Sequence, residues 1–303
     1  MIVAENLTKR FGERTAVDDV SFTVVPGKVT GFLGPNGAGK STTMRMIVGL
    51  DRPSSGRVSI DGSPYSRLRA PLTQVGVLLD AKAVHSGRSA RNHLRAMAAT
   101  HGIGRARVDE VIEITGIGSV AGRRAGTFSL GMGQRLGIAA ALLGDPRTLI
   151  LDEPVNGLDP EGVRWVREFV RHTAAQGRAV LLSSHLMSEM SQTADQVIVL
   201  GRGRMLADAP LADLVRDWTR AVVVVRSPRL SELVPALAGP GVAVTATAPG
   251  VAEITGLPAE RIGDLAAERG IALHELSPRS GSLEDAYLAL TGESVEYKTK
   301  EIA

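Results

Sequence analysis

The chain has 303 residues, of which 44% are apolar and 3% aromatic, and it carries 35 basic against 32 acidic side chains. This composition is that of a globular protein with a core, and the length favours two domains. Because the charge is nearly balanced and no stretch is polybasic, we expect no nucleic-acid partner. The absence of cysteine excludes disulfides, thiolate metal sites and cysteine nucleophiles.

The chain shows no sign of a membrane-spanning segment. Its first residues, MIVAENLTKRFGER, contain charges where a secretory signal would need an apolar run. No stretch approaches about 18 apolar residues, the length that predicts a transmembrane helix. We therefore expect a soluble, cytosolic protein that reaches a membrane only through a partner.

The first half of the chain alternates between strand and helix patterns. The apolar and polar residues of the first 33 positions predict strands, which end in the compact run Val29–Leu33. The pattern then predicts a helix over 39–49, a turn at 51–56, a strand over 57–61 and mostly helix over 89–143.

The same alternation continues to about residue 208. Strands are predicted over 148–152, 179–183 and 196–200. Asp159 followed by Pro160 is typical of a helix start, and Gly177 should end this helix. Strands that alternate with helices indicate an α/β fold with a mostly parallel sheet.

The amino-acid composition changes after about Pro210, where proline and glycine become frequent. The predicted elements there are a strand over 221–226 and helices over 257–269 and 282–290, the last with Ser282 as its N-cap. We interpret residues 209–303 as a small α+β accessory domain and residues 1–208 as the main domain.

Residues 34–42, GPNGAGKST, match the pattern G-x-x-x-x-G-K-[ST] between a predicted strand and a predicted helix. Glycines let backbone N–H groups turn toward phosphate oxygens at a helix N-terminus, whose dipole favours anions. In this pattern Lys40 reaches the β- and γ-phosphates and the Ser41 hydroxyl binds Mg²⁺. The expected ATP-binding residues of this segment are Gly34, Pro35, Asn36, Gly37, Ala38, Gly39, Lys40, Ser41 and Thr42.

Two carboxylates, Asp152 and Glu153, follow the predicted strand over 148–152. In P-loop ATPases an acidic residue at this place holds Mg²⁺, and we assign that role to Asp152. Glu153 is then placed to polarise the attacking water. Together with the glycine-rich loop, this pair predicts a P-loop ATPase.

Four further segments resemble the motifs of ABC transporter ATP-binding subunits. Phe128–Arg135, FSLGMGQR, resembles the ABC signature, and Asn156–Pro160, NGLDP, resembles the D-loop. Ser183–His185 is similar to the switch-histidine loop. Leu7–Gly12 is similar to the N-terminal strand whose aromatic, here Phe11, stacks on adenine. The resemblance covers residues 1–208 and implies a mostly parallel core sheet, an antiparallel β subdomain and a helical subdomain at about 84–143.

The resemblance implies a mechanism in which two copies face head to tail. Each ATP would lie between the glycine-rich loop of one copy and Ser129 and Gly131 of the other. His185 would contact the γ-phosphate, and Asp159 would cross the dimer interface. The implied catalytic residues are Glu153, His185 and Lys40. ATP binding would close the dimer, and this motion would drive a separately encoded permease at the cytoplasmic face of the cell membrane.

The chain departs from the family pattern at two positions. The family usually has a glutamine after the strand that here ends at Leu79, whereas this chain has Asp80; Gln74 precedes the strand. We align Asp80 with that glutamine and expect it to touch Mg²⁺ or its water only when ATP is bound. The alternative is a loop carboxylate that faces solvent. Leu130 replaces the first signature glycine, a form that resembles a subgroup of exporter ATPases.

Residues 210–303 resemble the appended domain of ATPases that serve drug, antibiotic or polysaccharide exporters. The clearest part is Ser282–Gly292, SLEDAYLALTG, which is similar to the closing helix of the daunorubicin-resistance type. The resemblance implies a regulatory or dimer-stabilising role, while a helix that only packs the accessory domain explains it equally well. We expect export of a drug, antibiotic or other hydrophobic compound.

Two other classes of protein fit the sequence less well than a transporter subunit does. A soluble ABC ATPase of repair would carry a long coiled coil between loop and signature, and one of translation would carry two cassettes; this chain has neither. A P-loop GTPase or kinase would leave the Ser129–Gly131 segment unexplained, and the guanine-reading Asn-Lys-x-Asp sequence is absent. Co-purification with a polytopic membrane protein would distinguish a transporter subunit from a soluble ABC ATPase.

Overall fold

The computed structural model describes residues 1–219, 222–279 and 281–291. Met1–Leu211 and Ala212–Leu290 belong to two different compact units. Two residues at the ends of expected segments, Ala221 and Gly292, lie outside the described residues. Within the described ranges, every helix is too short or too polar to cross a lipid bilayer.

The first unit is built on a six-stranded sheet with the spatial order β5-β6-β7-β3-β8-β9. Neighbouring strands are parallel except for β9, which pairs antiparallel with β8 at one edge. In chain order the strands are β3 (Val29–Leu33), β5 (Val75–Leu78), β6 (Thr148–Leu151), β7 (Ala179–Ser183), β8 (Gln196–Gly201) and β9 (Arg204–Pro210). Because β3, β6 and β7 are buried along their whole length, they consist almost entirely of apolar residues.

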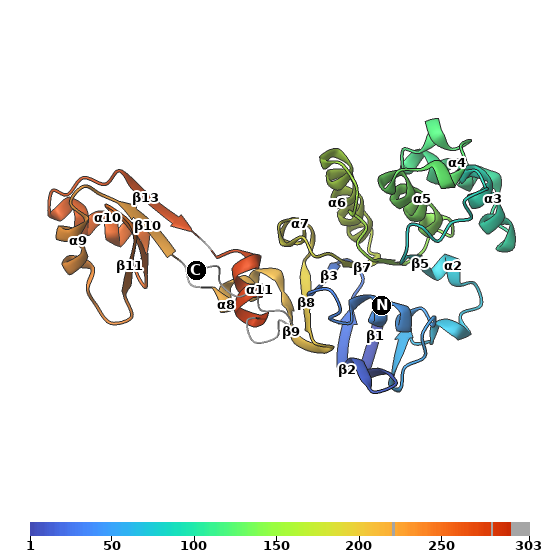
Figure 1. The fold of residues 1–303 in the computed structure, drawn as a ribbon, viewed down its shortest axis with the longest axis horizontal. Helices are drawn as coiled ribbons and strands as arrows, with labels where there is room; N and C mark the ends of the chain where they lie inside the picture. Colours follow the sequence, from blue (N-terminus) through green and yellow to red (C-terminus); the bar gives the residue numbers. More distant parts are fainter. Residues whose placement is uncertain (220–221, 280, 292–303) are drawn as a thin grey trace. The chain divides into compact units, whose positions relative to one another are not determined.

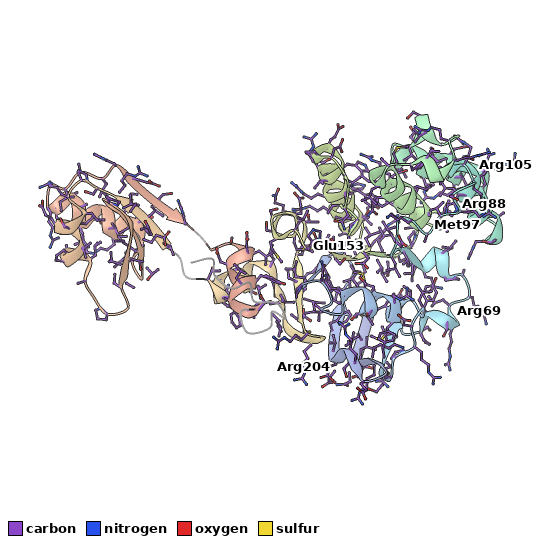
Figure 2. All side chains as sticks on the ribbon, viewed as in Figure 1. Arg69, Arg88, Met97, Arg105, Glu153 and Arg204 are labelled. Carbon is purple, nitrogen blue, oxygen red and sulfur yellow. The ribbon has the colours of Figure 1, made fainter. Side chains whose placement is uncertain are left out.

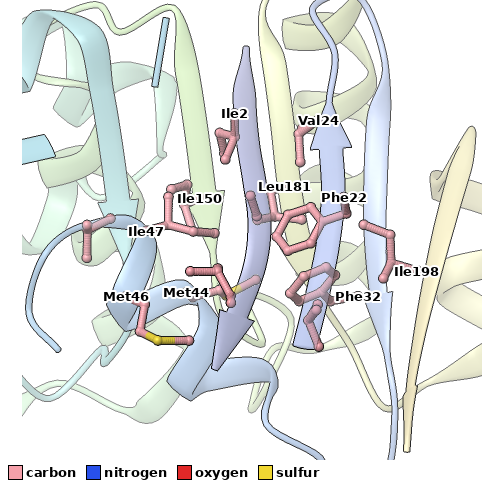
Figure 3. Packing of buried hydrophobic residues seen from close by; sticks show 14 of the residues in the cluster. Ile2, Phe22, Val24, Phe32, Met44, Met46, Ile47, Ile150, Leu181 and Ile198 are labelled. Atoms are coloured by element: carbon pink, nitrogen blue, oxygen red, sulfur yellow. The ribbon is translucent and has the colours of Figure 1, made fainter. Parts of the chain in front are cut away.

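A second, antiparallel sheet has the order β2-β1-β4. Its strands are β1 (Ile2–Phe11), β2 (Arg14–Val24) and β4 (Ser55–Ile60). The main core joins this sheet, the large sheet and helix α1 (Lys40–Ile47), as Figure 3 shows for part of the cluster. At its centre the rings of Phe22 and Phe32 meet edge to face, with centroids 5.0 Å apart. Because Phe22 lies in β2 and Phe32 in β3, this contact packs the two sheets against each other.

Helices α3, α4 and α5 form a group of their own, coloured green in Figure 1, on the side of β5 away from β1 and β2. Helix α5 packs on β5. The helices of this unit are α1, α2 (Pro71–Gln74), α3 (Ala90–Thr100), α4 (Arg105–Ile114), α5 (Leu130–Leu142), α6 (Pro160–Ala175) and α7 (Met187–Thr193), with single 3-10 turns at Tyr65–Arg67, Gly118–Val120 and Ala125–Thr127.

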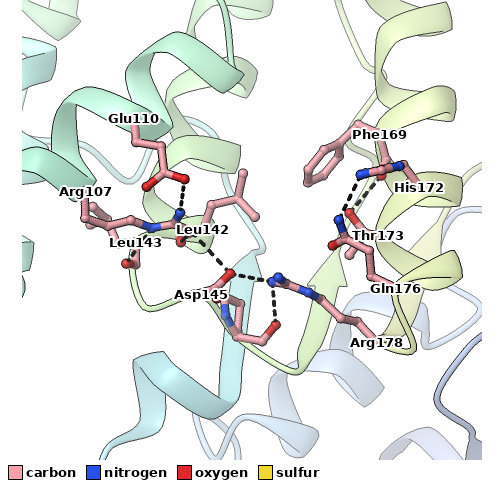
Figure 4. Close-up of polar contacts among 11 residues, drawn as sticks. Arg107, Glu110, Leu142, Leu143, Asp145, Phe169, His172, Thr173, Gln176 and Arg178 are labelled. Atoms are coloured by element: carbon pink, nitrogen blue, oxygen red, sulfur yellow. Dashed lines mark hydrogen bonds and ion pairs between the residues drawn. The ribbon is translucent and has the colours of Figure 1, made fainter.

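Asp145 connects this helical group to the large sheet (Figure 4). Its carboxylate pairs with Arg178, 2.8 Å away before β7, and with Arg107 of α4 at 3.5 Å. Arg107 also donates to the carbonyl oxygens of Leu142 and Leu143 at the end of α5. The Asp145 side chain is 62% exposed, so these pairs contribute about 0–1 kcal/mol each and the apolar packing dominates.

The second unit contains an antiparallel sheet of order β11-β12-β10-β13. Its strands and two helices follow one another as β-α-β-β-α-β, the ferredoxin-like arrangement. The elements of this part of the chain are α8 (Leu211–Trp218), β10 (Val222–Arg226), α9 (Leu230–Leu237), β11 (Ala243–Ala248), β12 (Val251–Thr255), α10 (Ala259–Glu268), β13 (Glu275–Arg279) and α11 (Leu283–Thr291). The N–H of Asp285 donates to the Ser282 hydroxyl at 3.1 Å, which confirms the predicted cap of α11.

The α/β fold class, with its antiparallel β subdomain and helical subdomain, is confirmed, but eight of the described α-helices and strands were not predicted. These are α2, α7, α8, α9, β9, β11, β12 and β13. Strand β9 follows a two-residue turn in which Arg202 and Gly203 both have positive φ, a geometry that closes a tight hairpin. Helix α9 contains Pro235, a residue that argues against a helix when only the sequence is read.

Candidate nucleotide-binding and hydrolytic site

The glycine-rich loop connects the end of β3 to the first turn of α1, as its sequence predicts. Gly39 is the N-cap of α1 and has φ +104°, in the region that side chains disfavour. A Cβ atom at Gly39 would lie 2.7 Å from the Ala16 carbonyl oxygen. Glycine at this position therefore lets the loop fold closely over the β2 backbone and leaves the N-terminus of α1 free of side-chain caps.

Lys40 folds its side chain back over the loop. Its Nζ donates to the carbonyl oxygens of Gly34, at 2.5 Å, and Pro35, at 3.3 Å, and the residue is 6% exposed. Burial lowers the pKa of Lys40, while the nearby carboxylates of Glu153 and Asp152 act in the opposite direction. The structure thus holds a buried cation beside a helix N-terminus, which is the electrostatic setting for an anion.

A cavity of about 480 Å³ opens above this loop. Residues 35–42 line it together with Glu153 and, from the β1–β2 hairpin, Phe11, Arg14 and Ala16. Its volume falls in the range of small-molecule sites. The predicted ATP-binding segment therefore lines one cavity, apart from Gly34, whose carbonyl instead holds Lys40.

Phe11 presents its ring at the end of β1, where it is 51% exposed. The Nζ of Lys9 lies 4.8 Å from the ring centroid. Arg14 stands opposite Phe11 in the hairpin register and also lines the cavity. Arg14 and Ala16 were not predicted from the sequence; the short Gly12–Glu13 turn after Phe11 was the signal that could have placed them.

The two predicted carboxylates follow β6 directly. The Ser183 hydroxyl donates to Asp152 Oδ1 at 2.5 Å, and the backbone N–H of Glu153 donates to the same hydroxyl at 2.9 Å. Glu153, labelled in Figure 2, has φ +48°. Its carbonyl accepts from Gln134 Nε2 at 3.1 Å and from the N–H of Asn156 at 3.2 Å. Ser183 and Gln134 were not predicted as site residues.

His185 lies beside Glu153, with Nδ1 2.8 Å from Glu153 Oε2. Its side chain is half exposed. With Glu153 ionised, this hydrogen bond requires the proton on Nδ1 of His185, which leaves Nε2 available to another group. The structure therefore brings Lys40, Asp152, Glu153 and His185 together.

The signature and D-loop residues act as helix caps in the single chain. The Ser129 hydroxyl accepts from the N–H of Met132 at 3.3 Å at the start of α5, and Asp159 Oδ1 accepts from the N–H of Gly162 at 2.8 Å at the start of α6. Among the described residues, neither of these two nor Gly131 lines the Lys40 cavity. Ser129 instead borders a separate hollow of about 300 Å³.

Asp80 also lies apart from the cavity lining within the described chain. It follows β5, where we aligned it with the family glutamine. Its Oδ1 accepts from the N–H of Lys82 at 2.8 Å, a turn that the side chain closes on its own loop. The expected contact of Asp80 with Mg²⁺ in the ATP-bound protein remains a prediction.

A parallel sheet, a glycine-rich loop that opens a helix, a buried lysine and an acidic pair at the next strand end define a P-loop nucleoside triphosphatase. The family model for ABC transporters matches residues 17–156, and one for a domain of unknown function matches residues 221–284.

Several curated proteins are similar to this chain over two thirds of its length or more. It is 42% identical over 205 residues to the uncharacterized ABC transporter ATP-binding protein YhcH of Bacillus subtilis (strain 168), which is 67% of each chain. It is 40% identical over 218 residues to the bacitracin transport ATP-binding protein BcrA of Bacillus licheniformis, 71% of each chain. The Nod factor export ATP-binding protein I of Rhizobium sp. (strain N33) is 33% identical over 294 residues, 95% of this chain and 96% of that protein.

The chain belongs to the ATP-binding proteins of ABC transporters, and it is a P-loop ATPase. The solved structure of an ATP-binding subunit of an ABC transporter matches it with a TM-score of 0.65 and 28% identity, over 72% of this chain and 92% of that chain. The ATP-binding cassette MJ0796, a post-hydrolysis dimer bound to ADP and Pi, shares the fold with a TM-score of 0.64 at 22% identity, over 69% of this chain and 98% of that chain.

Proposed function

We propose that this chain drives an exporter of an antibiotic, a drug or another hydrophobic compound. It would do so as a homodimer on the cytoplasmic face of the membrane, below a separately encoded permease. The names of similar proteins support this proposal, since they refer to bacitracin transport, lantibiotic transport and Nod factor export. The Ser-Leu-Gly form of the signature at Leu130 agrees with an exporter subgroup.

The single observation that supports the dimer is that the glycine-rich loop and the signature-like segment lie apart within one chain. The described residues that line the cavity of Lys40 include Glu153 but neither Ser129 nor Gly131. Ser129 sits at the N-terminus of α5, where backbone N–H groups are suited to an anion. A second copy, turned head to tail, would supply that helix end to the γ-phosphate, with Asp159 crossing the interface.

The hydrolytic step would use groups that already lie together. The ammonium of Lys40 would exchange the carbonyls of Gly34 and Pro35 for phosphate oxygens, while Phe11 stacks on adenine. Glu153 would polarise the attacking water. His185, hydrogen-bonded to Glu153, would orient that carboxylate and turn its free nitrogen to the γ-phosphate. Positioning and charge stabilisation account for most of such catalysis.

The donor groups fit Mg²⁺. The Ser41 hydroxyl lines the cavity, and Asp152 stands beside Glu153 at the end of β6. Among the described residues, no group of three or more His, Asp or Glu side chains is arranged to hold a metal ion by itself. Mg²⁺ is typically held in this way, by one or two protein oxygens and the substrate phosphates. The ion would be held by Ser41 and Asp152, and also by Asp80 once its hydrogen bond to the N–H of Lys82 opens. When bound, Mg²⁺ would neutralise phosphate charge.

For residues 209–303 we propose an accessory domain that regulates or stabilises the dimer. Within its described residues, the part from β10 to β13 has its own core, which includes Val223, Val225, Leu233 and Ile254. No catalytic group is assigned to it.

The Glu153→Gln variant tests the proposed function. We expect this variant to bind ATP and to sediment as a dimer only when ATP is present. It should hydrolyse ATP about 100-fold more slowly or worse, because it lacks the catalytic carboxylate. Captured from detergent-solubilised membranes of the native host with ATP, it should retain a polytopic membrane protein. Normal turnover by Glu153→Gln would contradict the base assignment. A dimer that retains no membrane protein would favour a soluble ABC ATPase.

A further inference from the structure

Ser183 is the last residue of β7 and is fully buried. In the parallel pairing of β6 with β7, Leu151 stands beside Leu182, so the next residues along, Asp152 and Ser183, continue side by side. The register of two core strands therefore carries this hydroxyl to the acidic pair.

The hydroxyl of Ser183 uses both of its hydrogen-bonding roles on that pair. It donates to Asp152 Oδ1 at 2.5 Å and accepts from the N–H of Glu153 at 2.9 Å. A serine hydroxyl has one proton to donate, so this proton is committed to the carboxylate. One side chain thereby fixes the rotamer of Asp152 and the backbone of Glu153.

The backbone of Glu153 needs such support. Its φ of +48° lies in the left-handed region, where a residue with a side chain persists only when its surroundings hold it. Ser183 holds the N–H, while Gln134 and Asn156 hold the carbonyl. This unusual backbone directs the Glu153 carboxylate to His185 and the cavity.

We propose that Ser183 is a positioning residue for ATP hydrolysis, which sets the metal-binding carboxylate of Asp152 and the water-polarising carboxylate of Glu153 through one hydroxyl. This inference rests on the proposed function, because it assumes those roles for the two carboxylates. A group that orients a metal-ligating carboxylate typically affects metal affinity or activity by about 10- to 100-fold.

Ser184 provides a matched control for Ser183. It is the next residue and is also buried, but its hydroxyl accepts from the N–H of Leu186 at 3.0 Å. The change Ser184→Ala thus removes a buried hydroxyl from the same strand end without touching Asp152 or Glu153.

The test compares Ser183→Ala, Ser183→Cys and Ser184→Ala in the full chain. Steady-state kinetics give kcat and KM for ATP. Electron paramagnetic resonance gives the affinity for Mn²⁺ in the presence of saturating ADP, where no turnover occurs. ADP binding without metal and the unfolding midpoint report on the fold. Ser183→Cys keeps nearly the same volume but offers only a weak donor and acceptor, so it remains informative if the alanine variant fails to fold.

We expect Ser183→Ala to lower kcat and to weaken Mn²⁺ binding, each by about 10-fold or more, with metal-free ADP binding within about twofold of wild type. Ser183→Cys should show the same pattern to a smaller degree, and Ser184→Ala should leave the Mn²⁺ affinity unchanged. The inference is overturned if Ser183→Ala binds Mn²⁺ as tightly as Ser184→Ala does, or if Ser183→Cys behaves as wild type. A wild-type protein that does not hydrolyse ATP would instead overturn the proposed function.

Discussion

The side chain of Leu130 lies against the backbone of Gly157. A Cβ atom at Gly157 would be 2.4 Å from Leu130 Cδ2, and Gly157 has φ +73°. The contact joins the signature turn at the start of α5 to the D-loop before α6 within one chain. It also explains how the chain carries leucine where the family usually has glycine, because the D-loop offers no side chain at the point of contact.

We expect Gly157→Ala to lower the free energy of unfolding by about 1–3 kcal/mol, since the new methyl group combines backbone strain with a collision. Adding Leu130→Ala should recover part of that loss, with a non-additive contribution of about 1 kcal/mol. Urea denaturation of the single and double variants measures it. Gly177→Ala is the matched control, because Gly177 also has positive φ but nothing within 4 Å of the added methyl. Strictly additive losses would show that the two residues do not interact.

Removal of the His185 imidazole should act on turnover rather than on binding. The bond between His185 Nδ1 and Glu153 Oε2 orients the carboxylate that we assign to water polarisation. We expect His185→Ala to lower kcat by about 100-fold or more, with KM for ATP within a few fold. The control is His172→Ala on α6, a histidine whose Nε2 lies 2.8 Å from Gln176 Nε2. Equal kcat values for the two variants would remove His185 from the mechanism.

The pH dependence of ATP binding should report on Lys40. Burial lowers the pKa of Lys40, so as the pH rises the folded chain loses this proton before the unfolded chain does. Between the folded and the unfolded pKa the unfolded chain therefore binds more protons, and the free energy of unfolding rises with pH. ATP binding has the opposite trend, because the phosphates require the ammonium. The Glu153 carboxylate raises the pKa of Lys40, so Glu153→Gln should move the alkaline loss of ATP affinity to lower pH.

ATP affinity measured in EDTA between about pH 7 and pH 10 tests this direction. Glu110→Gln, which removes an exposed carboxylate paired with Arg107, should leave the midpoint where it is in the wild type. A midpoint that stays fixed or rises in Glu153→Gln would contradict the assigned electrostatic coupling.

Surface and core contacts should differ sharply in their effect on stability. Phe32→Ala removes a fully buried ring from the main core and should cost about 3–5 kcal/mol in the free energy of unfolding. Asp145→Ala breaks two ion pairs of a mostly exposed carboxylate and should cost about 1 kcal/mol or less. Chemical denaturation measures both. A larger loss for Asp145→Ala would mean that this network, rather than apolar packing, joins the helical group to the sheet.

The glycine-rich loop and the acidic pair could be predicted because their chemistry is local. In each, a few consecutive residues carry both the turn and the reactive groups, as Lys40 and Glu153 show. Ser183 and Gln134 could not be found in this way, since their roles depend on strand register and helix packing that bring distant residues to Glu153.

Among the elements, β9 and α9 were missed for opposite reasons. The turn at Arg202–Gly203 that precedes β9 contains a single glycine, which is a weak signal for a hairpin. In α9, Pro235 argues against a helix, but the tertiary packing of Leu233 and Leu237 stabilises one. Local propensity is a weak guide in both cases because long-range contacts override it.

The most direct test of the composite site mixes two inactive variants. Lys40→Ala lacks the phosphate-binding cation, and Ser129→Asp keeps the cap of α5 but places an anion where phosphate should bind. Each alone should be inactive, but a mixture in equal amounts should regain about a quarter of wild-type ATPase activity, because half of randomly formed dimers are mixed and each has one complete site. No recovery on mixing, or full activity of Ser129→Asp alone, would contradict a site shared between two copies.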